Sequence, residues 1–139
     1  MADPRVELLR KVPLFGSCTD QQLRFIASRV EDVDVPAGRE LCREGESGGE
    51  FFVLVSGAAE VKRGGRTVDR LGAGDFFGEI SLLDHRPRSA TVTTAEPSRV
   101  LALSHTQFRD VLHQEAGIAV TILYAVVERL RAASAPPRD

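Results

Sequence analysis

The chain has little of what a secreted, membrane-spanning or disulfide-bonded protein requires. Its 139 residues include two cysteines, Cys18 and Cys42, which lie far apart and in no C-x-x-C arrangement. We therefore expect reduced thiols rather than a disulfide framework. No apolar run at the start is long enough for a signal peptide, and no later run is long enough to span a bilayer. These absences predict a cytoplasmic protein with no membrane partner.

No strong excess of either charge is present. Lys and Arg total 18, Asp and Glu total 20, and the formal net charge is −2. This balance gives no electrostatic reason to expect nucleic acid as a direct partner. Apolar residues make up 42% of the chain and charged residues 27%, as in ordinary globular proteins. The length suits one domain with a single core, and we expect residues 1–139 to form it.

Histidine is scarce and scattered, which argues against metal-dependent catalysis. His85, His105 and His113 are well separated, and no H-x-H occurs. The enzyme alternative is a metal-dependent cupin, whose fold is a double-stranded β-helix. Its metal site needs clustered histidines with a carboxylate. No serine or cysteine stands beside a histidine base in a recognisable nucleophile setting. We predict no metal and no enzyme activity.

Secondary-structure patterns divide the chain into three parts and a tail. Residues 1–30 have helical periodicity, and Thr19 followed by Gln22 has the spacing of a capping box. Short apolar runs with turn residues every eight to twelve positions fill residues 31–104, and indicate a sandwich, jelly roll or barrel. Gly64-Gly65 is typical of a two-residue hairpin turn. Helical periodicity returns over 105–133, as two helices, and a tail at 134–139 is expected to be disordered.

The stretch from residue 77 to residue 92, F-G-E-I-S-L-L-D-H-R-P-R-S-A-T-V, contains the most specific signal. It places the carboxylate of Glu79 nine residues ahead of the guanidinium of Arg88. A ligand that suits both groups has an anion at one end and a hydroxyl donor at the other. A cyclic nucleotide meets this description, because its phosphate carries a negative charge and its ribose keeps a 2′-hydroxyl.

These residues resemble the cyclic nucleotide-binding domain family, which occurs in the bacterial catabolite activator, in regulatory subunits of cAMP-dependent protein kinase and in cyclic nucleotide-gated channels. The specific match is F-G-E-I-S-L-L with P-R-S-A-T-V in register, the phosphate-binding cassette of that family. L-F-G-S-C-T-D-Q-Q-L, R-E-G-E-S-G-G-E-F-F-V-L-V-S-G and L-G-A-G-D-F-F-G-E support it. The resemblance covers residues 12–131. It implies a mainly β fold with flanking helices, namely a β-roll like a double-stranded β-helix or jelly roll.

The residue types suggest a role for each part of the cassette. Arg88 presents a planar fork of donors that suits a phosphate, although a surface salt bridge is the alternative. A short helix from Gly78 to Leu83 has free N–H groups at its start for the anion, and Glu79 can accept from the ribose 2′-hydroxyl or cap that helix. The predicted ligand-binding residues are Phe77, Gly78, Glu79, Ile80, Ser81, Arg88, Ser89 and Ala90.

The identity of the base stays open. In the family that the chain resembles, a threonine just after the phosphate-binding arginine holds a guanine amino group, whereas serine also occurs there in cAMP binders. Ser89 stands at this position. We therefore expect cAMP as the ligand and keep cGMP as the alternative. The resemblance places a lid over the base on the last helix, where Leu123, Val127 and Leu130 are candidates; packing against the barrel or against a partner helix is the alternative.

The resemblance implies a binding switch. Ligand would draw the cassette inward, a hinge at residues 103–105 would relax, and the last helix would fold over the base. That helix would then regulate an effector protein or form a homodimer. The starting methionine and the closing P-P-R-D favour a stand-alone sensor. The alternatives are a regulatory fragment of a larger transcription factor, channel or enzyme, and an interaction domain of the same fold without ligand.

Overall fold

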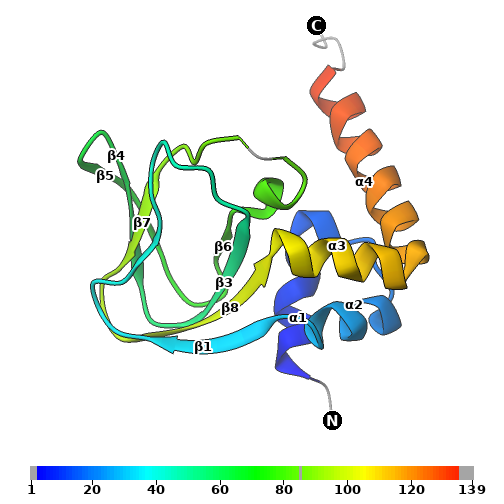
Figure 1. Ribbon diagram of the computed structural model, residues 1–139, viewed down its shortest axis with the longest axis horizontal. Helices are drawn as coiled ribbons and strands as arrows, with labels where there is room; N and C mark the ends of the chain where they lie inside the picture. Colours follow the sequence, from blue (N-terminus) through cyan, green and yellow to red (C-terminus); the bar gives the residue numbers. More distant parts are fainter. Residues whose placement is uncertain (1–2, 85, 135–139) are drawn as a thin grey trace, which may run out of the picture. The chain divides into compact units, whose positions relative to one another are not determined.

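The structure is a computed structural model, and it describes residues 3–84 and 86–134. The chain forms two compact units. Residues up to Ser28 and from Arg109 onward make a helical unit, whereas Arg29–Phe108 make a β unit (Figure 1). His85 and most of the predicted tail lie outside the described residues.

Eight strands in the described part of the β unit form two four-stranded antiparallel sheets. One sheet has the order β1-β8-β3-β6, with bounds Glu31–Val35, Ser98–Ser104, Glu50–Ser56 and Phe76–Phe77. The other has the order β2-β7-β4-β5, with bounds Glu40–Cys42, Thr91–Thr94, Ala59–Arg63 and Arg66–Leu71. The predicted β-roll with flanking helices is therefore confirmed.

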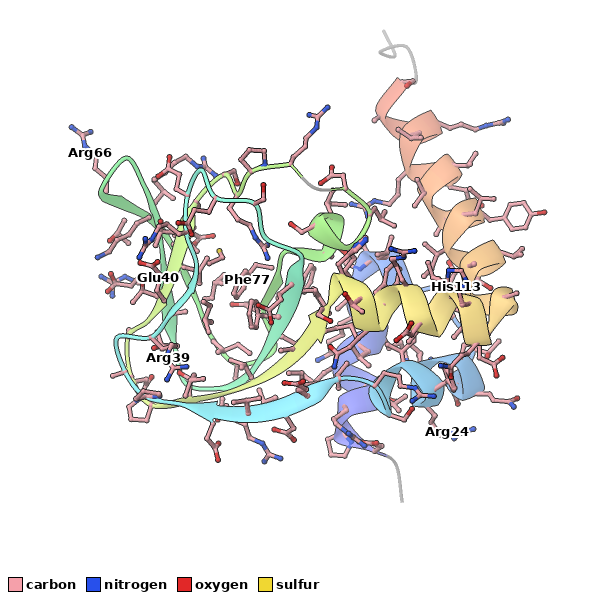
Figure 2. All side chains as sticks on the ribbon, viewed as in Figure 1. Arg24, Arg39, Glu40, Arg66, Phe77 and His113 are labelled. Atoms are coloured by element: carbon pink, nitrogen blue, oxygen red, sulfur yellow. The ribbon has the colours of Figure 1, made fainter. Side chains whose placement is uncertain are left out.

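The core of the β unit centres on β3, whose sequence E-F-F-V-L-V-S is apolar on both faces. Phe51 to Leu54 are all buried, as expected of a strand covered on both sides. Phe52 and Leu54 pack in one cluster with Val35, Val100 and Ala102. The ring of Phe77 stacks on that of Phe52 with 5.1 Å between centroids, so the strand that leads into the cassette is fixed to the core (Figure 2).

The hairpin between β4 and β5 has the predicted turn. Gly64 has φ 60° and Gly65 has φ 80°, and Arg63 pairs with Arg66 across them. Positive φ at both central residues is the type I′ geometry that glycine permits. The short strands β2 and β6, of three and two residues, were not predicted, because such lengths show no periodicity.

The helical unit contains α1 (Pro4–Arg10), the 3-10 helix η1 (Pro13–Phe15), α2 (Asp20–Ala27) and most of the two C-terminal helices α3 (His105–Gln114) and α4 (Ala116–Ser134). Asp3 caps α1 by accepting from the Arg5 N–H at 2.9 Å, and hydrogen bonds from Arg5 lower the pKa of that carboxyl. In α4, Ile118, Ile122 and Ala125 are buried. Among the described helices, none has the length and hydropathy to cross a membrane.

The capping box of α2 gives a first testable prediction. The Thr19 hydroxyl accepts from the Gln22 N–H at 3.1 Å, and the Gln22 side chain accepts from the Thr19 N–H at 2.9 Å. Thr19→Ala removes one acceptor of a helix N-terminus, and we expect the free energy of unfolding to fall by about 1 kcal/mol. Urea denaturation followed by circular dichroism measures it. Thr19→Ser is the control that keeps the oxygen, and an equal loss in both variants would contradict the capping role.

Candidate functional site

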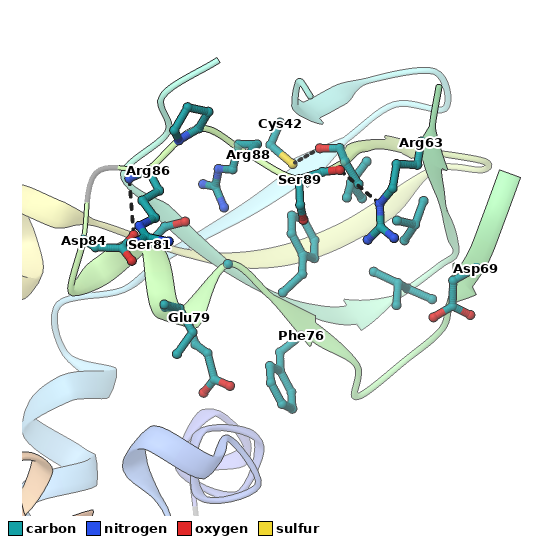
Figure 3. A pocket seen from close by; sticks show the side chains of 18 residues that line it. Cys42, Arg63, Asp69, Phe76, Glu79, Ser81, Asp84, Arg86, Arg88 and Ser89 are labelled. Atoms are coloured by element: carbon teal, nitrogen blue, oxygen red, sulfur yellow. Dashed lines mark hydrogen bonds between the residues drawn. The ribbon is translucent and has the colours of Figure 1, made fainter. Parts of the chain in front are cut away.

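The β unit contains a pocket of about 630 Å³, within the range of small-ligand sites (Figure 3). Its lining comes from the sheet β2-β7-β4-β5 and from the segment that includes β6 and the 3-10 helix η2 (Glu79–Leu82). The structure brings together in this lining all the residues predicted to contact ligand, which are Phe77, Gly78, Glu79, Ile80, Ser81, Arg88, Ser89 and Ala90.

The side chain of Arg88 is 9% exposed and lines this pocket. Its Nη2 donates to the carbonyl of Glu50, and its Nε has no hydrogen-bond partner in the described structure. The backbone around it is fixed, because the Arg88 N–H donates to the Glu46 carbonyl and the Gly45 N–H donates to the Arg88 carbonyl, both at 2.9 Å. The guanidinium is therefore held through Nη2, while Nε keeps an unused N–H donor.

The charge environment of Arg88 differs from that of a surface salt bridge. Over residues 3–84 and 86–134 no carboxylate lies within ion-pair distance of its guanidinium. A buried charge without a counter-charge is costly, and proteins normally pair such groups. The arrangement supplies a fixed positive charge and an unused N–H donor, which together suit an anion that enters the pocket.

Two glycines make room for this guanidinium. A Cβ at Gly78 would lie 2.5 Å from Nη1 of Arg88 and 2.7 Å from the Glu50 carbonyl, and φ at Gly78 is +85°. A Cβ at Gly48 would collide with Nε of Arg88. Side chains at either position would displace the guanidinium. The close approach of the guanidinium to the backbone therefore requires glycine at both positions.

The helix η2 carries Glu79, Ile80 and Ser81 of the cassette. Gly78 is its N-cap, and its first N–H groups have no partner within the helix by geometry. Glu79 and Ser81 are half-buried in the pocket lining, whereas Ile80 is 47% exposed. At the other end of η2 the Leu82 carbonyl lies 3.1 Å from Nδ1 of His105, the first residue of α3. The cassette is thus joined by a hydrogen bond to the predicted hinge.

Part of the pocket lining was not predicted. It includes side chains on one face of the sheet, namely Cys42, Arg63, Asp69, Leu71 and Val92. Alternation along each strand is a signal for such residues, but only the pairing register decides which face meets the pocket. Burial raises the pKa of the Cys42 thiol, although the charge of Arg88 opposes this shift. Among the described residues, no group of three His, Cys, Asp or Glu is placed to hold a metal ion.

The three lid candidates lie on α4, within the helical unit. Leu123 and Leu130 are each 61% exposed on α4, and Val127 is 40% exposed. The lid role of these three residues stays a prediction.

Replacing the two glycines with the same conformation separates close approach from backbone strain. Gly74 has φ +90° with nothing near its Cβ position, whereas Gly78 has φ +85° and the crowded surroundings described above. We expect Gly74→Ala to cost about 1–2 kcal/mol of unfolding free energy, from the left-handed backbone alone. Gly78→Ala should cost about 1–3 kcal/mol more, from overpacking. Chemical denaturation measures both, and equal losses would contradict the close packing at Gly78.

Comparison with known proteins agrees with the resemblance seen in the sequence. The profile of the family described as "Cyclic nucleotide-binding domain" matches residues 32–115. A cyclic nucleotide-gated potassium channel of Rhizobium etli is 36% identical over 96% of this chain and 36% of its own length.

Solved structures show the same likeness. The N-terminal domain of a transcriptional regulator from Streptomyces coelicolor A3(2) has TM-score 0.84 and 31% identity, with 95% of this chain and 98% of that one covered. The regulatory domain of Toxoplasma gondii PKA, solved with cAMP, has TM-score 0.71 and 28% identity, with 80% and 46% covered. Among the curated relatives it matches, the chain spans 23% to 36% of their length.

Proposed function

The chain belongs to the cyclic nucleotide-binding domain family, and from this premise we propose that it is a cAMP sensor that regulates a partner protein. The observation that carries the proposal is the buried Arg88, which lines the pocket and whose Nε has no partner in the described residues. The T. gondii regulatory domain solved with cAMP supports this choice of nucleotide. The family is a regulatory, ligand-binding one, and we propose that this chain itself catalyses no reaction.

The roles of the pocket residues follow from their chemistry. Arg88 takes the cyclic phosphate through Nε and one Nη, because this edge of the fork matches two phosphate oxygens. Glu79 accepts from the ribose 2′-hydroxyl, and Gly78 lets the backbone approach the sugar. Ser81 and Ser89 add hydroxyl donors, while the side chains of Phe77, Ile80 and Ala90 complete the apolar wall.

The first prediction of affinity concerns Arg88. We expect Arg88→Ala to weaken cAMP binding by about 3 kcal/mol or more, since each hydrogen bond to a charged group contributes about 1.5–3 kcal/mol. This corresponds to a loss of roughly two orders of magnitude. Calorimetric titration with cAMP and with cGMP measures it and ranks the two nucleotides.

A matched control is Arg66→Ala. Arg66 is exposed at the hairpin tip, where its side chain points away from the roll (Figure 2), and its loss removes the same charge. The control should keep the wild-type affinity. Equal affinities for the wild type and Arg88→Ala, with both folded by circular dichroism, would overturn the phosphate role.

The output of the sensor is proposed to run through α3 and α4. The hydrogen bond between His105 and the Leu82 carbonyl couples the ligand-contacting helix η2 to the start of α3. Movement of η2 on binding would change this contact and bias the position of the helices that follow. An effector protein would read that change.

A homodimer through α4 is proposed as the assembly. Val120, Leu123, Val127 and Leu130 recur at spacings of three, four and three, and all are exposed. Valine at the a positions with leucine at the d positions favours a parallel two-stranded coiled coil. The buried residues Ile118, Ile122 and Ala125 lie on another face, so the exposed stripe is available to a second copy.

Sedimentation of α4 variants tests this assembly. We expect the wild type to be a dimer and Leu123→Glu to be a monomer, since a carboxylate in the apolar seam lacks a partner. Ala132→Glu places the same charge at an exposed position of α4 outside the stripe, and it should remain a dimer. A monomeric wild type would overturn the dimer and leave the stripe for the predicted lid.

A further inference from the structure

One row of residues crosses the sheet that forms the pocket wall. Cys42 of β2 pairs with Val92 of β7, Val92 pairs with Val61 of β4, and Val61 pairs with Asp69 of β5. Directly paired residues point to the same face of a sheet, and all four line the pocket. The row is apolar on three strands and ends in a carboxylate on the edge strand β5.

The neighbours of this row complete a wall with a polar border. Side chains two positions along the same strands share its face, and three of them also line the pocket, namely Arg63, Leu71 and Ala90. The middle of the wall is thus apolar, and its charged residues are Arg63 and Asp69. Figure 3 shows these two side chains on one side of the pocket and Glu79 on the other.

Each of the two charged side chains is held by one hydrogen bond to a backbone group. Nε of Arg63 donates to the carbonyl of Ser89 at 3.1 Å, and Oδ1 of Asp69 accepts from the Arg70 N–H at 2.8 Å. In the described part of the chain neither side chain takes part in an ion pair. The Nη groups of Arg63 and Oδ2 of Asp69 therefore remain as a donor and an acceptor at the border of the apolar wall.

We infer that Arg63 and Asp69 are specificity-determining residues that read the edge of the adenine base. This inference rests on the proposed binding of cAMP, with the phosphate at Arg88 and the ribose at Glu79. A planar base has an apolar face that suits the wall, and its edge then meets the polar border. The hydrogen bond from Arg63 to the carbonyl of Ser89, the residue next to Arg88, connects this border to the segment that carries the phosphate anchor.

The donor and acceptor pattern assigns a role to each residue. The only N–H donor on the edge of adenine is its 6-amino group, and a carboxylate can only accept. Asp69 therefore takes the 6-amino group. The ring nitrogens of adenine are acceptors. The remaining N–H donors of Arg63 are therefore suited to a ring nitrogen beside the amino group.

A cycle of two ligands and two proteins tests the role of Asp69. The ligands are cAMP and purine riboside 3′,5′-cyclic monophosphate, which lacks only the 6-amino group. We expect the wild type to prefer cAMP by about five- to tenfold, at the lower end of what a specific base contact provides. Asp69→Ala should bind both ligands equally. Asp34→Ala, a control on β1 away from the pocket lining, should keep the preference.

Arg63 has a separate readout in the same titrations. Both ligands have the ring nitrogens, so Arg63→Gln should weaken both by a similar factor of about five. Arg66→Gln removes the same charge at the hairpin tip and should change neither affinity. Because Arg63 and Asp69 are exposed, all four variants should fold, which circular dichroism verifies.

The outcomes separate this inference from the proposed function. A wild type that binds neither ligand would overturn the proposed function, and the reading of the base with it. A wild type that binds cAMP but shows no preference, or an Asp69→Ala variant that keeps the preference, would overturn the role of Asp69 alone. An unchanged affinity in Arg63→Gln would overturn the role of Arg63.

Discussion

The guanidinium of Arg88 is buried beside a pocket, and the one hydrogen bond that its side chain makes within the described residues goes to a backbone carbonyl, that of Glu50. Burial of a charge with no counter-charge is unfavourable, so the surroundings must hold the group in place until an anion arrives. Gly48 and Gly78 leave the space for it, and backbone hydrogen bonds to Gly45 and Glu46 fix its main chain. The local sequence therefore stabilises a site before any ligand binds.

The segment from Gly48 to Glu50 connects this site with the start of α3. Gly48 packs against the Arg88 side chain, and the Glu50 carbonyl accepts from it. Between them, a Cβ at Gly49 would lie 3.0 Å from Cβ of His105. His105 in turn contacts the Leu82 carbonyl at the end of η2. A change in the position of Arg88 or η2 on ligand binding would therefore alter the contacts of the first residue of α3. This is the physical basis for the proposed output.

The sequence allowed much of the fold and the central motif to be predicted, because these depend on local chemistry. The capping box at Thr19, the Gly64-Gly65 turn and the short helix after Gly78 are each specified by a few adjacent residues. The pocket wall depends instead on pairing between strands. In β4 the register against β5 shifts between Val61 and Lys62. Such an irregularity changes which side chains share a face, and for this reason Arg63 and Asp69 could not be placed from the sequence.

We propose above all that the unused donor of Arg88 is the phosphate anchor of a cyclic nucleotide site. A crystal structure of the unmodified chain with cAMP tests it most directly. We expect Nε and one Nη of Arg88 each to lie about 2.7–2.9 Å from an oxygen of the cyclic phosphate. A complex in which the phosphate lies elsewhere and Nε still has no acceptor would contradict it.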